Sequence, residues 1–155
     1  MHNDIQQILL TEEQIKARVQ ELGQQLSRDY KDKNPVFICI LKGAAIFYAD
    51  LLRNFEDHCE MDFMQLSSYR GTQSTGNVVV LKDVAQDLEG RHVVVVEDIL
   101  DSGNTLSYLK EYLLARGAAS VNIVTLLDKP SRRQKAIYAD IAGFEVPDEF
   151  VVGYG

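Results

Sequence analysis

The sequence has few of the residues from which disulfide frameworks and histidine metal sites are built. It contains two cysteines and three histidines in 155 residues, and the histidines are scattered without a metal-ligand spacing. Cys39 lies inside an apolar run, which favours a buried, unreactive thiol. The sequence also lacks an apolar run near the roughly 20 residues of a membrane span, and lacks the basic region and apolar core of a secretory signal. These absences predict a soluble, cytoplasmic protein that does not enter a membrane.

Basic residues are outnumbered by acidic ones. There are 16 Lys and Arg against 23 Asp and Glu, so the formal net charge is −7. Nucleic-acid-binding proteins usually carry a basic face, so this balance argues against a nucleic-acid partner. A small polyphosphate is still a possible ligand, because backbone N–H groups and metal ions can hold it without net positive charge. The length fits a single domain over residues 1–155.

Segments typical of strands alternate with segments typical of helices. We predict helices over 11–30, 43–55 and 105–116, and strands over 36–41, 61–68, 78–81, 93–96, 121–127, 137–142 and 150–152. Thr11 and Gln14 have the spacing of a capping box that opens the first helix. The inner face of the second helix is expected to hold Ile46, Ala49, Leu51 and Leu52. Residues 68–77 are polar and contain two glycines, which predicts a mobile loop on a hairpin. The alternation indicates an α/β fold with a mainly parallel, doubly wound sheet.

Three carboxylates follow the four-valine run at 93–96. In a doubly wound sheet, ligands bind beyond the carboxyl ends of the strands, and these residues lie at such an end. Glu97 and Asp98 have the chemistry to accept hydrogen bonds from vicinal hydroxyls or to hold a divalent cation, and Asp101 to accept a proton. A turn rich in helix caps explains one carboxylate and one serine. It does not explain three carboxylates, because unpaired charges beside a buried strand are costly in free energy. The pattern therefore favours a ligand site.

The four residues after Asp101 form a small polar loop at the start of a predicted helix. Backbone N–H groups at a helix N-terminus bind phosphate, and Ser102 and Thr105 add hydroxyl groups. Gly103 allows the backbone to approach a ligand closely. The loop therefore predicts a phosphate site next to the carboxylates.

Residues 94–106, VVVEDILDSGNTL, resemble the signature of type I phosphoribosyltransferases that binds phosphoribosyl pyrophosphate (PRPP). The chain from about Gln6 to its last residue resembles the hypoxanthine-guanine branch of that family. The resemblance implies the family fold, with a small hood and a mobile flap. It also implies a purine salvage enzyme that joins hypoxanthine or guanine to the ribose 5-phosphate of PRPP, with Mg²⁺ as cofactor and IMP or GMP and pyrophosphate as products.

The resemblance also implies roles for individual residues. Asp101 would be the catalytic base at N7 of the purine, and Glu97 and Asp98 would be the metal ligands. The residues implied to contact PRPP are Lys42, Gly43, Ser68, Tyr69, Glu97, Asp98, Asp101, Ser102, Gly103, Asn104 and Thr105. The residues implied to contact the purine are Ile99, Lys129, Phe150 and Val151. Leu41-Lys42-Gly43 matches the family's pyrophosphate loop with its cis peptide, and Ser68-Tyr69 matches the flap.

The resemblance further implies a homodimer or homotetramer, with the Lys42 loop near a subunit contact. Members of the family usually continue past the position of Gly155 with a metal-binding aspartate and an arginine near the pyrophosphate, so we expect the domain to be truncated at this end. A regulator that senses PRPP on the same fold is an alternative, although the acidic charge weighs against it. A phosphoacceptor receiver domain would not need the loop at 102–105. Another purine or pyrimidine member of the superfamily is disfavoured by Lys129 and by Phe150-Val151.

Overall fold

The computed structural model describes residues 8–69 and 77–154. The elements are α1 (Glu12–Asp29), β1 (Val36–Leu41), α2 (Ala45–Arg53), β2 (Glu60–Tyr69), β3 (Asn77–Lys82), β4 (His92–Leu100), α3 (Asn104–Ala115), β5 (Ser120–Asp128), the 3-10 turn η2 (Pro130–Arg132) and β6 (Ile141–Glu145). The six strands form one sheet in the order β3-β2-β1-β4-β5-β6. All neighbours are parallel except β2 and β3, which are antiparallel. The predicted α/β fold with a mainly parallel sheet is confirmed.

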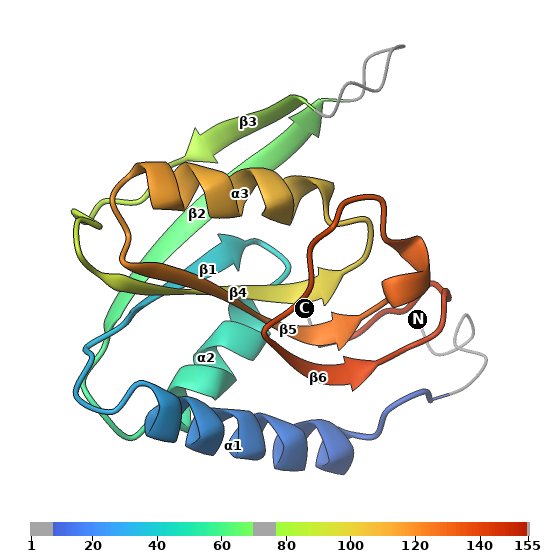
Figure 1. Ribbon diagram of the computed structural model, residues 1–155. Coiled ribbons are helices and arrows are strands. Elements are labelled where there is room, and N and C mark those ends of the chain that lie inside the picture. The colour runs from blue at the N-terminus through green and yellow to red at the C-terminus, as the bar shows by residue number, and fades with distance from the viewer. Residues whose placement is uncertain (1–7, 70–76, 155) are drawn as a thin grey trace.

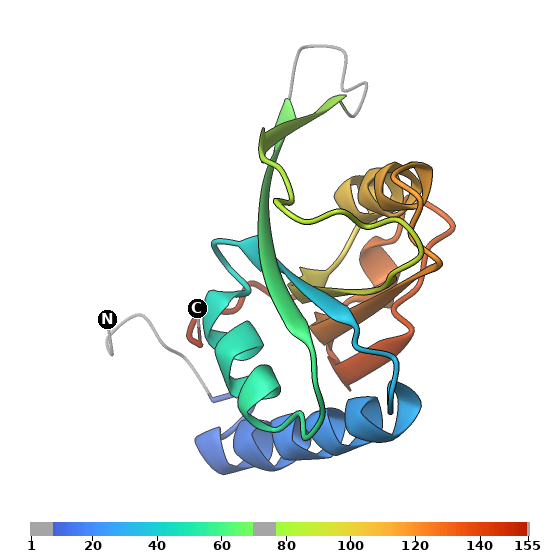
Figure 2. The same ribbon diagram turned by 90° about the vertical axis from the view of Figure 1, so that its left-hand side faces the viewer.

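Helices cover both faces of the sheet, as the doubly wound prediction requires. Figures 1 and 2 show α1 and α2 on one face and α3 on the other. Successive residues of β1 and β4 point to opposite faces, so Phe37 and Val94 pack with α1 and α2, while Ile38 and Val95 pack with α3. Because both faces of β1 and β4 are buried, their sequences contain continuous apolar runs that do not alternate with polar residues. Cys39 is fully buried, as predicted, and burial, with Glu97 and Asp98 nearby, raises the pKa of its thiol to about 12.

The first helix agrees with its prediction and the second differs in its inner face. Thr11 and Gln14 form both hydrogen bonds of the capping box at the start of α1. In α2 the buried residues are Phe47, Tyr48 and Leu51. The predictions for Ile46 and Ala49 were wrong, because both are exposed. The Tyr48 hydroxyl donates to the Phe37 carbonyl at 2.7 Å, so the helix turns the face with Phe47, Tyr48 and Leu51 toward the sheet. Leu52 is partly buried against the same core.

The strands predicted over 137–142 and 150–152 were misplaced. Strand β6 begins at Ile141, where pairing with Val124 begins. Before it, the N–H of Asp140 donates to the Ile123 carbonyl at 2.9 Å, but the Ile123 N–H donates to the Asp140 carboxylate at 2.7 Å, so a side chain takes the place of a strand carbonyl beside β5. Residues 150–152 have no regular structure, and Phe150 is 94% exposed. The segments 129–140 and 146–154, on either side of β6, lie beside the carboxyl ends of β4 and β5 and are called the hood.

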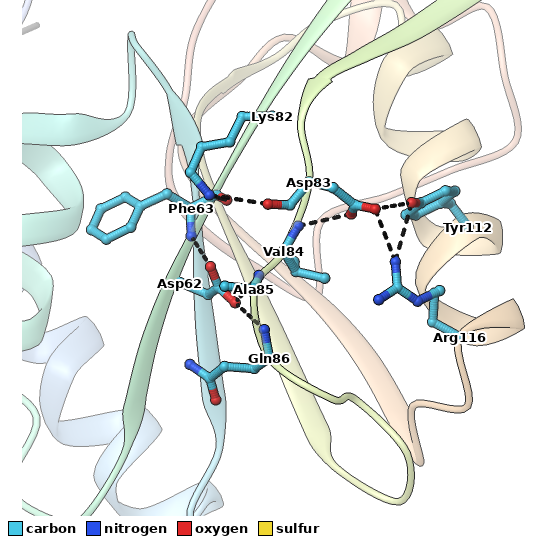
Figure 3. Close-up of polar contacts among 9 residues, drawn as sticks. All are labelled: Asp62, Phe63, Lys82, Asp83, Val84, Ala85, Gln86, Tyr112 and Arg116. Atoms are coloured by element: carbon cyan, nitrogen blue, oxygen red, sulfur yellow. Dashed lines mark hydrogen bonds and ion pairs between the residues drawn. The ribbon is translucent and has the colours of Figure 1, made fainter.

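The hairpin of β2 and β3 is confirmed on both sides of the loop predicted over 68–77, whose residues 70–76 lie outside the described part of the chain. Its return arm is held by two carboxylates (Figure 3). The buried Asp62 accepts backbone N–H groups of Ala85 and Gln86 at 3.0 and 3.1 Å. Asp83 accepts the hydroxyl of Tyr112 in α3 and the guanidinium of Arg116, the residue after that helix. The hairpin is thereby fixed to the helix whose first two residues, Asn104 and Thr105, belong to the polar loop at 102–105.

Among residues 8–69 and 77–154, no helix combines the length and the apolar character of a membrane span.

Candidate active site

A pocket lies where β1 and β4 end at the carboxyl edge of the sheet. Its lining residues are Ile40, Leu41, Gly43, Leu66, Glu97, Ile99, Leu100, Asp101, Ser102, Gly103, Thr105 and Leu106. The position agrees with the rule that ligands bind beyond the carboxyl ends of parallel strands. Seven of the residues implied by the family resemblance therefore meet in one pocket: Gly43, Glu97, Ile99, Asp101, Ser102, Gly103 and Thr105.

Glu97 and Asp98 belong to strand β4, which runs to Leu100 and not only to the predicted end at Val96. The ladder continues because β5 supplies partners as far as Asp128, which pairs with Leu100. Glu97 Oε1 accepts the N–H of Asp98 at 2.9 Å, and Asp98 Oδ1 accepts the N–H of Ile99 at 2.8 Å. Burial, with the neighbouring Asp98 as the next cause, raises the pKa of the Glu97 carboxyl well above its usual range.

Two adjacent carboxylates are a donor set that suits Mg²⁺. This ion is usually held by one or two carboxylates, with water and substrate phosphate oxygens as its other ligands. Within the described ranges, no group of three or more His, Cys, Asp or Glu side chains converges on a possible metal site. Two carboxylates alone leave coordination positions for water and phosphate oxygens, so Glu97 and Asp98 fit a metal that binds together with a phosphate-bearing substrate. A cation there would also offset the repulsion that raises the pKa of Glu97.

The end of β1 packs directly against these carboxylates. A Cβ atom at Gly43 would lie 2.5 Å from Asp98 Oδ2, so any other residue here would push the Asp98 carboxylate out of its position. The preceding Leu41-Lys42 peptide is cis, as the resemblance to the pyrophosphate loop predicted. Lys42 itself is exposed and does not line the pocket.

The polar loop has a backbone shape that only glycine adopts easily. Gly103 has φ +82° and precedes the first residue of α3, and both Gly103 and Thr105 line the pocket, so the first turn of that helix lies beside the pocket. Asp101 is exposed, and its Oδ1 accepts the N–H of Ser102 at 2.7 Å. The carbonyl of Ser102 in turn accepts N–H groups from Gln134 and Lys135 of the hood. Carboxylate, loop and hood therefore form one connected unit.

Of the residues implied to contact the purine, Ile99 lines the pocket, whereas Lys129, Phe150 and Val151 lie in the hood and not in the lining. Lys129 follows β5; its N–H donates to the Leu100 carbonyl, and its Nζ donates to the Glu149 carbonyl at 2.5 Å. The second bond holds the segment of Phe150 and Val151 near the strand end. Ser68 is exposed at the end of β2, and the side chain of Tyr69 lies outside the described part. Asn104 also does not line the pocket; its side chain donates to Gln134.

Arg133 was not predicted from the sequence to lie near the site. Its guanidinium donates to the Asp101 carbonyl at 2.7 Å and to Asp128 Oδ1 at 2.6 Å. Nothing in the sequence distinguishes it from its neighbour Arg132, because the contact depends on how the hood folds back onto the loop.

Replacing Glu97 by glutamine is expected to stabilise the ligand-free protein at neutral and higher pH. The pKa of Glu97 in the folded chain lies above the ordinary value near 4.3, so stability falls as pH rises from about 4 through that raised pKa. Glutamine removes the titration, and a gain on the order of 1 kcal/mol is expected at about pH 8, with little gain at about pH 5. Urea unfolding measures it, with Glu145→Gln at an exposed site as control. A loss of stability in Glu97→Gln at about pH 8 would contradict this assignment.

Comparisons with known proteins agree with the fold. A family model described as the phosphoribosyl transferase domain matches residues 6–155. The hypoxanthine-guanine phosphoribosyltransferase of Bacillus subtilis is 52% identical over 156 residues, which cover 100% of this chain and 87% of that protein. A crystal structure of a hypoxanthine phosphoribosyltransferase from Staphylococcus aureus superimposes with a TM-score of 0.96 at 49% identity, covering 100% of this chain and 85% of that one.

A third relative is longer. The bifunctional protein TilS/HprT of Listeria innocua is 51% identical over 156 residues, and the chain spans only 24% of its length. The matched region in every case includes the β4–α3 segment that forms the pocket. The chain belongs to the phosphoribosyl transferase domain family.

Proposed function

We propose that the protein transfers the phosphoribosyl group of PRPP to hypoxanthine, and also to guanine, in purine salvage. The observation that carries this proposal is that Glu97, Asp101 and three residues of the loop at 102–105 line one and the same pocket. Asp98 lies beside Glu97 in the strand. The products are IMP or GMP and pyrophosphate. The names of the relatives support a transferase and do not favour a PRPP-sensing regulator.

The reaction breaks the bond between the anomeric carbon and the pyrophosphate oxygen and forms a bond to N9 of the purine. Glu97 and Asp98 bind the ribose hydroxyls and stabilise the positive charge that develops on the ring. Asp101 accepts the proton that leaves N7. Ser102, Gly103, Asn104 and Thr105 hold the 5′-phosphate through the start of α3. Mg²⁺, when bound at Glu97 and Asp98 with PRPP, neutralises charge on the pyrophosphate.

The purine is held from the hood in this proposal. Lys129 donates to the exocyclic oxygen at position 6, while Phe150 and Ile99 pack on the two faces of the base and Val151 bonds to its edge. Lys42-Gly43 binds the pyrophosphate, and Ser68-Tyr69 closes over PRPP. Residues 1–155 act as one domain, in a cytoplasmic homodimer or homotetramer with the Lys42 loop near the subunit contact.

A panel of bases tests the proposal in the full-length protein as its gene encodes it. With PRPP and Mg²⁺, hypoxanthine and guanine are expected to give nucleoside monophosphates and adenine is not, because the ammonium of Lys129 would face a second donor at position 6. A Lys129→Met variant is expected to lose at least about tenfold in kcat/KM for hypoxanthine, with Lys135→Met as the control. Product from adenine alone, or from no base, would overturn the proposal.

A further inference from the structure

Arg133 lies between the end of β5 and the loop that carries Asp101. One nitrogen of its guanidinium donates to Asp128 Oδ1 at 2.6 Å; another donates to the carbonyls of Asp101 at 2.7 Å and Leu100 at 3.4 Å. The Arg133 and Asp128 side chains are only 17% and 16% exposed. The ion pair is therefore largely shielded from water, unlike most surface pairs.

The stem of Arg133 also covers the glycine of the loop. Its Cδ would lie 3.3 Å from a Cβ placed on Gly103. Arg132 offers an internal contrast, since it is 54% exposed and pairs with Asp148, which is 52% exposed. The two adjacent arginines thus differ in burial and in their hydrogen-bond partners. Among the contacts of the described residues, Arg132 donates to Asp148, whereas Arg133 donates to the Asp101 carbonyl.

We propose that Arg133 is a positioning residue that fixes the carboxylate of Asp101 relative to Lys129, an inference that rests on the function proposed above. It holds the carbonyl of the Asp101–Ser102 peptide, whose N–H donates to Asp101 Oδ1. A rotation of this peptide would carry that N–H away from the carboxylate. The Leu100 carbonyl accepts both Arg133 and the N–H of Lys129, so the same contacts tie the hood to the loop.

Arginine is required for this role because its planar fork reaches two acceptors at once, whereas lysine is a single point charge. Arg133→Met and Arg133→Lys are therefore both expected to lower kcat by about tenfold or more, since small displacements of a catalytic group are costly. The KM for PRPP is expected to change by a smaller factor than kcat, because Glu97 and Asp98 keep their places and only the loop at 101–105 loosens. Arg132→Met is the matched control and should leave kcat unchanged.

A purely structural ion pair predicts a different pattern. In that case Arg133→Lys would restore kcat, and Asp128→Asn would lower it as much as Arg133→Met does. The positioning role predicts no rescue by lysine and a small effect of Asp128→Asn, whose amide oxygen can still accept from Arg133.

Amide hydrogen exchange in the ligand-free protein provides a readout that does not depend on turnover. Exchange at residues 101–105 is expected to accelerate in both Arg133 variants and not in Arg132→Met. If the parent protein shows no transferase activity, the proposed function fails while the exchange data still decide whether Arg133 orders the loop. Unchanged exchange together with full kcat in Arg133→Lys would overturn the inference.

Discussion

Replacing Asp101 by alanine is expected to lower kcat by at least about a hundredfold, the size typical of a lost general base. The carboxylate is exposed at the mouth of the pocket and is oriented by the N–H of Ser102 at 2.7 Å. PRPP binding should change little, because Glu97 and the N–H groups at the start of α3 remain.

Asp101→Asn separates charge from geometry. The amide oxygen can still accept from Ser102, so the loop keeps its shape while the side chain loses its ability to take a proton. Steady-state kinetics with hypoxanthine should therefore show a similar fall in kcat for both variants. An asparagine variant as active as the parent would exclude Asp101 as the base.

Replacing Gly103 by alanine is expected to cost about 2–4 kcal/mol of stability and to raise the KM for PRPP at least about tenfold. The residue has φ +82°, and a Cβ atom would lie 2.4 Å from Ile137 Cγ2 and 3.3 Å from Arg133 Cδ. The methyl group can be accommodated only if the hood moves away from the loop. That movement would misplace the N–H groups at the start of α3.

Gly90→Ala is the matched control for the clash. Gly90 has φ +72°, but a Cβ atom there would meet nothing within 4 Å. It should cost only about 1 kcal/mol, the strain of the left-handed backbone alone. Urea unfolding and PRPP titration of the two variants measure the difference. Equal losses in both would show that packing of the hood on Gly103 does not support the phosphate loop.

The central strands and the polar loop could be predicted because local sequence determines them. The four valines at 93–96 are apolar on both faces, and the capping pair of Thr11 and Gln14 acts within one turn. The extension of β4 to Leu100 could not be predicted, since polar residues stay in the ladder only because β5 provides partners. The shift of β6 has the same cause, because pairing with Val124 sets where that strand begins.

The candidate site divides in the same way. Glu97, Asp101 and Gly103 lie close together in the sequence, so they can be recognised as a motif, and they line one pocket. Arg133 reaches Asp101 across 32 positions of sequence, so its role depends on tertiary packing that no local pattern encodes. Phe150 was expected in a strand and is instead 94% exposed. Its contact with a purine stays a prediction.

The most direct test of the proposed function is the stoichiometry of one reaction. The full-length protein is mixed with PRPP, hypoxanthine and Mg²⁺, and IMP, pyrophosphate and free ribose 5-phosphate are quantified together over many turnovers. We predict IMP and pyrophosphate in equal amounts with little ribose 5-phosphate. PRPP that binds without conversion, or that is hydrolysed to ribose 5-phosphate without IMP, would contradict a transferase that acts on hypoxanthine.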